Sequence, residues 1–140
     1  MKKQIVMTVL VILSVVLIHP LRADERAEQS AKAASDAWLA SVDQGEYPRS
    51  WQEAATYFRM AVAQEQWVRS MEAFRKPLGN VLSRKLRSKQ YTKTLPGAPD
   101  GHYVVLQYAT SFENKQFAVE TVTPMLDSSG QWRVSGYHIK

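Results

Sequence analysis

The sequence predicts an α+β domain in which helices from the amino-terminal half pack on one face of a curved, four-stranded antiparallel sheet. Three observations predict this class. Apolar residues recur at steps of three or four up to Gly79 and at steps of two after it. Short turn sequences separate the later segments, as they do in hairpins. The chain has 140 residues and no cysteine, so one core must hold the fold together without disulfides.

Residues 1–23 predict a cleaved signal peptide. Two lysines precede residues 5–18, which contain neither charge nor proline, and a short polar stretch ends at Ala23. A spanning helix needs about 20 apolar residues, so this run is short for a membrane span, and a retained anchor is the alternative. We therefore expect residues 24–140 to form one exported domain, periplasmic or secreted, with no stable membrane span after cleavage.

Two helical regions are predicted ahead of the strands. The first, residues 26–42, carries an apolar stripe at steps of three and four and is followed by Gly45. The second begins with a capping box of Ser50 and Glu53, in which each side chain bonds a backbone N–H. This region ends at Pro77. Its predicted apolar face consists of Trp51, Ala54, Ala55, Phe58, Trp67, Met71 and Phe74.

Four strands follow, with hairpin turns at ENKQ and DSSGQ. The predicted strands are SRKLRSKQYTK (83–93), HYVVLQYATSF (102–112), QFAVETVTPML (116–126) and QWRVSGYHI (131–139). We expect Glu113 to face Gln116 across the first turn and Leu126 to face Trp132 across the second.

This register predicts a polar group on one apolar sheet face. Glu120 would lie between Ala109 and His138, with Gln107 as a diagonal neighbour. A Glu–His pair can exchange protons with a substrate, so Glu120 and His138 are the candidate catalytic residues. A cross-strand pair at the solvated end of the sheet is the alternative interpretation.

The first strand lies in a basic block, because residues 66–93 hold eight bases and one acid. It is either an edge strand protected by charge from pairing with other chains or a surface for an unknown protein or anionic envelope component. Simple alternation points Lys85, Arg87 and Lys89 to one side. The candidate partner-binding residues are Arg84, Lys85, Arg87 and Lys89. Nucleic acid is not expected, since the exported chain carries a net charge of only +2 without Lys2, Lys3 and Arg22.

The second sheet face is also predicted to be apolar. One layer of helices covers one face, so a second subunit is a candidate cover and a homodimer is possible. The residues of this predicted face are Val104, Leu106, Tyr108, Phe112, Phe117, Val119, Met125, Tyr137 and Ile139. No cofactor and no metal site are predicted, because residues 24–140 contain two histidines, no cysteine and no glycine-rich phosphate loop.

Four segments carry a resemblance to a known family: DAWLASVDQGEYPRSWQEAATYF, QWVRSMEAFRKPLGNVLSRKL, LPGAPDGHYVVLQYATSF and ETVTPMLDSSGQWRVSGYHIK. Together they resemble the uncharacterised domain-of-unknown-function family numbered 4019, over roughly residues 34–140. The resemblance implies an exported bacterial domain related to the cystatin-like or nuclear-transport-factor-2-like folds. It implies no activity and no catalytic residues.

Those folds often use the hollow between helices and sheet as a pocket, which is an analogy of fold alone. The candidate ligand-binding residues of such a hollow are Trp38, Tyr47, Trp51, Tyr103, Gln107, Glu120, Trp132 and His138. Plain core packing is the alternative for the aromatic members. We expect a non-enzymatic envelope protein that binds a macromolecule or small ligand through its sheet or hollow. The alternatives are a small acid–base enzyme of isomerase, dehydratase or hydrolase type, and an inhibitor or immunity-type protein that docks by its basic strand.

Overall fold

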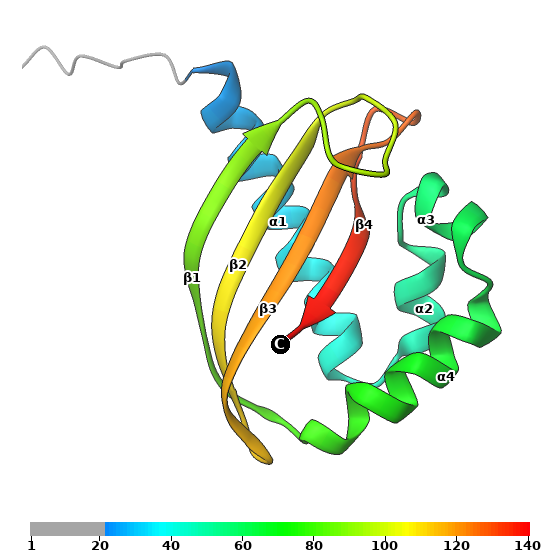
Figure 1. Cartoon of the computed structure of the whole chain (residues 1–140), viewed down its shortest axis with the longest axis vertical. Coiled ribbons are helices and arrows are strands. Elements are labelled where there is room, and N and C mark those ends of the chain that lie inside the picture. The colour runs from blue at the N-terminus through cyan, green and yellow to red at the C-terminus, as the bar shows by residue number, and fades with distance from the viewer. Residues whose placement is uncertain (1–21) are drawn as a thin grey trace, which may run out of the picture.

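The computed structural model describes residues 22–140. The predicted signal peptide lies outside the described residues, apart from its last two positions. Helices precede strands, and the predicted α+β class is confirmed (Figure 1). One long helix crosses a face of the open sheet, while three shorter helices lie beyond one sheet edge. The likeness to cystatin-like or nuclear-transport-factor-2-like folds stays a prediction.

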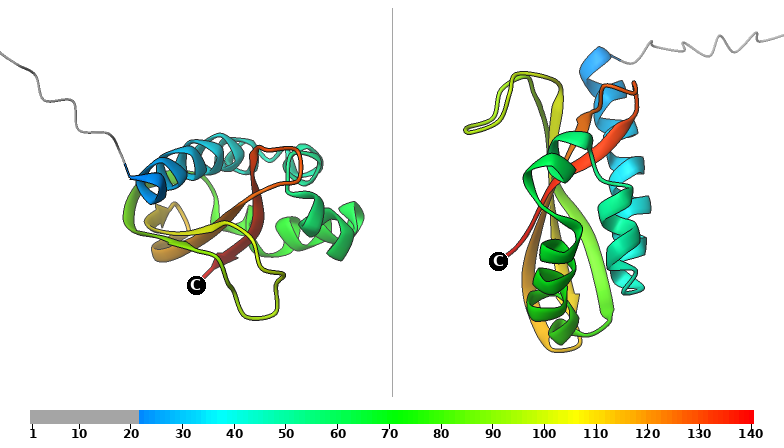
Figure 2. Two further views of the ribbon diagram at one scale, coloured as in Figure 1. Left: turned by 90° about the horizontal axis from the view of Figure 1, so that it is seen from above. Right: turned by 90° about the vertical axis from the view of Figure 1, so that its right-hand side faces the viewer.

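The long helix α1 spans Ala23–Asp43 and confirms the first predicted helix. It covers what we call the inner face of the sheet, and the opposite face is the outer face (Figure 2). The chain leaves α1 at Gly45, whose φ of 75° is left-handed and favours glycine. The buried side of α1 consists of Ala31, Ser35, Trp38, Leu39, Ser41 and Val42.

The second helical region is divided into α2 (Tyr47–Gln52), α3 (Thr56–Ala61), α4 (Gln64–Phe74) and a 3-10 turn (Lys76–Leu78). The predicted capping box is wrong, because Ser50 lies inside α2, whose first turn already contains Pro48. The Ser50 hydroxyl donates to the Tyr47 carbonyl over 2.7 Å and accepts from Trp67 Nε1 over 2.9 Å. Ser50 therefore links α2 to α4 instead of capping a helix.

The sheet is an antiparallel meander with strand order β1-β2-β3-β4, as predicted. Its strands are β1 (Val81–Thr92), β2 (Tyr103–Phe112), β3 (Lys115–Leu126) and β4 (Trp132–Ile139). Strands β1 and β4 form the two edges. The shorter helices lie on the β4 side (Figure 1).

The β2–β3 turn lies one residue earlier than predicted. Phe112 faces Lys115 across it, and an irregularity between Thr110 and Phe112 then leaves a net shift of one position, which puts Glu120 opposite Tyr108 and not opposite Ala109. Since neighbouring residues of a strand point to opposite faces, a shift of one position exchanges the two faces. Glu120 therefore lies on the inner face, under α1.

The β3–β4 pairing follows the prediction next to its turn and departs from it farther along. An irregularity between Thr123 and Pro124, where proline has no N–H to donate, changes the register. As a result Thr121 faces His138. The predicted contact between Glu120 and His138 is wrong, because the two side chains belong to opposite faces.

A bulge between Leu86 and Ser88 interrupts the alternation of β1. Lys89 pairs with β2 at an inner-face position, and its amino group lies 3.1 Å from a carboxylate oxygen of Glu28 on α1. Lys85 is exposed on the outer face. The prediction that Lys85, Arg87 and Lys89 share one side is therefore wrong.

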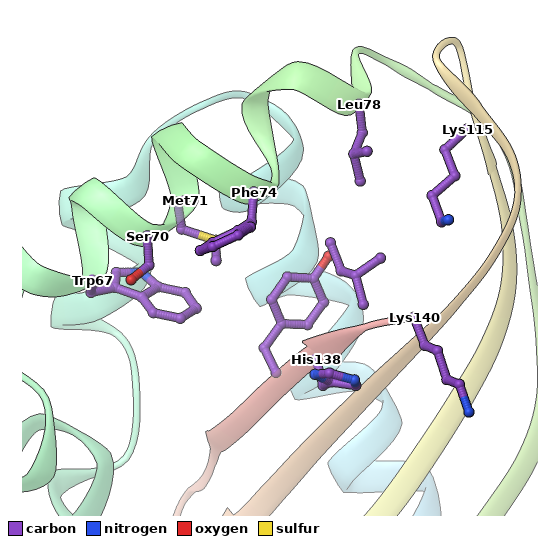
Figure 3. Close-up of a pocket in the computed structure, with 10 residues that line it drawn as sticks. Trp67, Ser70, Met71, Phe74, Leu78, Lys115, His138 and Lys140 are labelled. Carbon is purple, nitrogen blue, oxygen red and sulfur yellow. The ribbon is translucent and has the colours of Figure 1, made fainter.

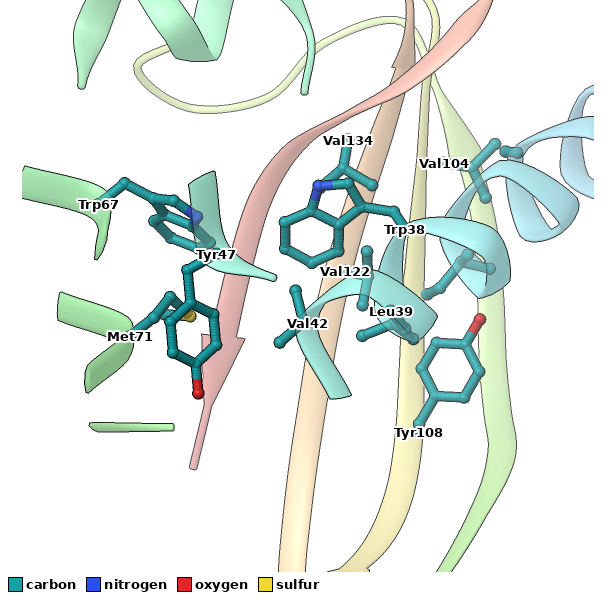
Figure 4. Packing of buried hydrophobic residues seen from close by; sticks show 12 residues of the cluster. Trp38, Leu39, Val42, Tyr47, Trp67, Met71, Val104, Tyr108, Val122 and Val134 are labelled. Carbon is teal, nitrogen blue, oxygen red and sulfur yellow. The ribbon is translucent and has the colours of Figure 1, made fainter. Parts of the chain in front are cut away.

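The core lies between α1, α2, α4 and the inner face (Figure 4). Residues of the predicted second face do not stay together: Leu106 and Tyr108 are buried in this core, whereas Phe117 and Val119 are exposed on the outer face. The predicted dimer surface is wrong as a set, because the shift in register divides it between two faces. The dimer itself stays a prediction.

Candidate functional site

Four charged side chains meet at the end of α1 and form what we call the inner ion cluster: Asp43, Arg75, Arg84 and Glu120. The Arg84 guanidinium lies between two carboxylates. It donates to Glu120 over 2.7 and 3.1 Å and to Asp43 over 2.7 and 2.9 Å. Arg75 adds a 3.2 Å contact to Asp43. Two cations and two anions thus balance within one group, in which Arg75 and Glu120 are buried and Asp43 and Arg84 are partly buried.

Arg84 remains charged in this cluster. Burial by itself lowers the pKa of Arg84, but the hydrogen bonds to Asp43 and Glu120 outweigh it and raise that pKa above the usual value. Paired geometry of this kind, two N–H groups on one carboxylate, is the strong form of an ion pair.

Glu120 is fully buried, and each of its carboxylate oxygens has partners. Besides Arg84, it accepts from the Thr110 hydroxyl over 2.6 Å and from the Tyr137 hydroxyl. Burial and the nearby Glu120 charge raise the pKa of Tyr137 well above 10. A carboxylate with four donors and no open side has a structural role, because a substrate has no approach to it.

A cleft of about 610 Å³ opens between α4 and the end of β4, and we call it the α4–β4 cleft (Figure 3). Side chains of α4 form one wall, and the last residues of β4 form the other. The wall of α4 is mostly apolar. The lining residues are Trp67, Ser70, Met71, Phe74, Leu78, Lys115, Tyr137, His138, Ile139 and Lys140.

The charged side chains that line this cleft are all basic. Lys115 and Lys140 lie among the lining residues, together with His138, and no aspartate or glutamate is among them. Phe74 on the opposite wall is 72 % exposed, so its ring is available to a ligand in the cleft. The cleft thus combines uncovered apolar surface with positive charge.

The predicted polar cluster does not assemble. Glu120 points inward, His138 lies at the α4–β4 cleft, and Gln107 is exposed on the outer face, where its amide oxygen accepts from Ser88 over 3.3 Å. The predicted acid–base pair is therefore not in contact. Of the eight predicted ligand-binding residues, His138 alone lines this cleft.

The aromatic residues predicted to line a hollow lie in or beside the core. Trp38 is buried and donates to the Ser50 carbonyl over 2.8 Å. Tyr103 is buried and donates to the Pro99 carbonyl over 2.6 Å. Tyr47 is buried, while Trp51 and Trp132 pack partly buried against the same core. The ring nitrogen of Trp38 and the hydroxyl of Tyr103 therefore have partners within the protein, as is usual for buried tryptophan and tyrosine.

The basic side chains of β1 lie on two different faces of the sheet. Arg84 and Lys89 turn inward to Glu120 and Glu28, so neither is available on a docking face. Lys85 and Arg87 line a shallow outer-face groove of about 400 Å³ beside Phe117, which is 89 % exposed.

Sequence reasoning missed the wall of α4. Trp67, Met71, Phe74 and Leu78 follow one another at steps of four, three and four, so a single helical stripe carries them. This signal was present in the sequence but has the same form as a core stripe. The exposure of Phe74 distinguishes it.

Two further classes of site were sought in residues 22–140. No group of three or more histidine, cysteine, aspartate or glutamate side chains in this range is placed to hold a metal ion. None of the helices in this range is long and apolar enough to span a membrane.

Comparison with known proteins gives a family and no neighbours. A family model described as "Protein of unknown function (DUF4019)" matches residues 34–137. No curated protein and no solved structure was found to match the chain.

Proposed function

We propose a function from the geometry of the cleft. The chain belongs to the DUF4019 family of proteins of unknown function, and this family implies no activity. The protein is a non-enzymatic binding protein of the cell envelope. Its ligand places an apolar group in the α4–β4 cleft. The exported location rests on residues 1–23 of the sequence.

The single observation that carries this proposal is the apolar wall of α4, in which the ring of Phe74 is exposed above buried Trp67 and Met71. Pockets that bind ligands usually have volumes of about 300–1,000 Å³, mostly apolar walls and a few polar groups that orient the ligand. The α4–β4 cleft, at about 610 Å³, has these properties. A smaller opening of about 310 Å³ lies beside Asp43 and Arg75 of the inner ion cluster, but the groups that line it are mostly polar, and the carboxylates of the cluster are paired with guanidinium groups.

A second candidate is docking of an acidic protein on the outer-face groove. Lys85 and Arg87 flank Phe117 there, and positive charge beside an exposed ring suits an acidic partner. The inhibitor or immunity-type function predicted for the basic strand would use this groove.

The test uses the anionic apolar fluorophore anilinonaphthalenesulfonate and two matched variants. Phe74→Glu and Phe117→Glu each place a carboxylate on an exposed ring position, one at the cleft and one on the outer face. We expect Phe74→Glu to weaken binding of the fluorophore about tenfold or more and Phe117→Glu to leave it unchanged. The reverse pattern would favour the outer-face groove, and no binding to the folded wild-type protein would overturn the proposal for the cleft.

A further inference from the structure

We propose that the occupant of the α4–β4 cleft is an extended segment of another protein, which adds to β4 as a fifth strand and carries a carboxylate toward the lysine-lined rim. This inference rests on the proposed binding function and specifies the chemical class of the ligand.

The first step is the backbone of β4. Val119 and Lys140 exchange both backbone hydrogen bonds, over 2.9 and 3.0 Å. In an antiparallel pair such residues alternate with residues whose N–H and C=O groups point away from the partner strand. With the register Val122 to Tyr137 and Glu120 to Ile139, the backbone groups of Tyr137 and Ile139 therefore point away from β3.

Within residues 22–140, no backbone hydrogen bond from another segment reaches Tyr137 or Ile139. Both residues line the α4–β4 cleft. The cleft therefore presents two N–H donors and two C=O acceptors along one wall, at the spacing of a strand. This is the template that an added strand requires.

The second step is the other half of the same edge. The Ala55 N–H donates to the Val134 carbonyl over 2.8 Å, so the link between α2 and α3 already bonds to β4 there. The protein's own backbone thus already bonds to the β4 edge at Val134. The open half begins where this contact stops.

The third step is the wall opposite the edge. Trp67 and Met71 form the buried base of the α4 wall, and Phe74 forms its exposed end. In an added strand every second side chain points to the same side, so alternate residues of the segment would contact this wall. The ligand is therefore expected to alternate apolar and polar residues.

The fourth step is charge. Lys115 and Lys140 lie at the cleft without an acidic residue among the lining residues. A segment that brings a carboxylate beside them gains a charge-assisted contact, whereas a segment that brings a lysine is repelled. Acidic segments are therefore expected to bind more tightly than basic ones.

The binding experiment uses immobilised synthetic peptides of about ten residues that alternate valine or leucine with threonine. One set carries two glutamates and a matched set carries two lysines. We expect the purified protein to bind the acidic set at least about tenfold more tightly. N-methylation of successive peptide amides should weaken binding at every second position only, because alternate amides face β4.

Two measurements on the protein address the backbone directly. Ile139→Pro removes the outward N–H at an edge position that proline tolerates, and Ile139→Val keeps it. We expect the proline variant to lose peptide binding about tenfold or more and the valine variant to retain it. Amide hydrogen exchange of Tyr137 and Ile139 should be fast in the free protein and slow with the acidic peptide.

The outcomes separate the two proposals. Binding of the fluorophore in the cleft without any peptide binding would overturn the peptide inference and leave the proposed function standing. Peptide binding that is insensitive to N-methylation and to Ile139→Pro would also overturn it. Slow exchange at Ile139 that depends on protein concentration alone would identify a second copy of the chain as the occupant. Failure of both probes would overturn both proposals.

Discussion

The inner ion cluster and the α4–β4 cleft lie on two sides of β4, and Tyr137 contacts both. Its hydroxyl donates to Glu120 on the inner side, while the residue lines the cleft on the other. The cluster consists of charged side chains, which are the residue type that a sequence alone suggests for an active site. The cleft contains mainly apolar residues that sequence reasoning assigns to a core.

The difference lies in how completely each region is partnered. In the inner ion cluster, Arg84 donates four hydrogen bonds to two carboxylates, and Glu120 accepts from three side chains. At the cleft, the ring of Phe74 is mostly exposed, and the backbone groups of Ile139 point away from the sheet. Buried charges whose partners are complete stabilise a fold, whereas unpartnered groups along a cleft are available to a ligand.

The largest expected effect is the loss of Arg84. Arg84→Met leaves fully buried Glu120 beside partly buried Asp43 without their shared cation, and we expect it to lower the free energy of unfolding by about 3–5 kcal/mol. Urea unfolding followed by circular dichroism measures this. Lys85→Met, at the next position on the exposed face, is the matched control and should change stability by about 0.5 kcal/mol or less. Equal effects of the two substitutions would contradict the structural role of the cluster.

The next effect concerns the shared residue. Tyr137→Phe removes one donor from fully buried Glu120 and keeps the ring at the cleft, so we expect a loss of about 1–3 kcal/mol in stability. Binding of anilinonaphthalenesulfonate should change less than twofold. If binding of the fluorophore falls and the free energy of unfolding does not change, the Tyr137 hydroxyl acts in the cleft and not in the inner ion cluster.

Raising the pH provides a test without substitution. Burial raises the pKa values of Tyr108 and Tyr137 in the folded protein above 10. In the unfolded chain both ionise near pH 10, so the folded state binds more protons above that pH and stability falls as pH rises. We expect a loss of about 1 kcal/mol for each of these tyrosines one pH unit above 10. Melting temperatures at about pH 8 and 11 measure it, and Tyr137→Phe should reduce the dependence.

The smallest expected effect is on the cleft wall. Phe74→Ser removes a ring that is 72 % exposed, and we expect a change in unfolding free energy of about 0.5 kcal/mol or less. Met71→Ala, in the buried base of the same wall, should cost about 2–5 kcal/mol. A large loss of stability for Phe74→Ser would indicate that the wall is part of the core and would count against a binding role.

The order of elements and the meander followed from the sequence because periodicity is a local property. The change from steps of three and four to steps of two was visible on either side of Gly79, and the structure places the 3-10 turn Lys76–Leu78 and β1 there. The register was not predictable, because it depends on irregularities near Phe112, Pro124 and Arg87 that alternation alone does not reveal.

The site was only partly predictable, for two physical reasons. The partners of Arg84 are 36 and 41 residues away, and no spacing rule connects them. The stripe of Trp67, Met71 and Phe74 was visible, but whether a stripe is covered depends on where the helix packs. Here α4 lies beyond the β4 edge, so the end of its stripe remains open (Figure 1).

The bulge of β1 bears on how relatives of this chain are aligned. It allows Arg84 and Lys89 both to face inward although five positions separate them, an odd number that strict alternation forbids. A homologue shorter by one residue between these positions can keep both inward contacts without a bulge, because four positions would then separate them and strict alternation places both on one face. A one-residue alignment gap placed there therefore marks loss of the bulge, and retention of the residue pairs Arg84–Glu120 and Lys89–Glu28 would show that the inward contacts remain.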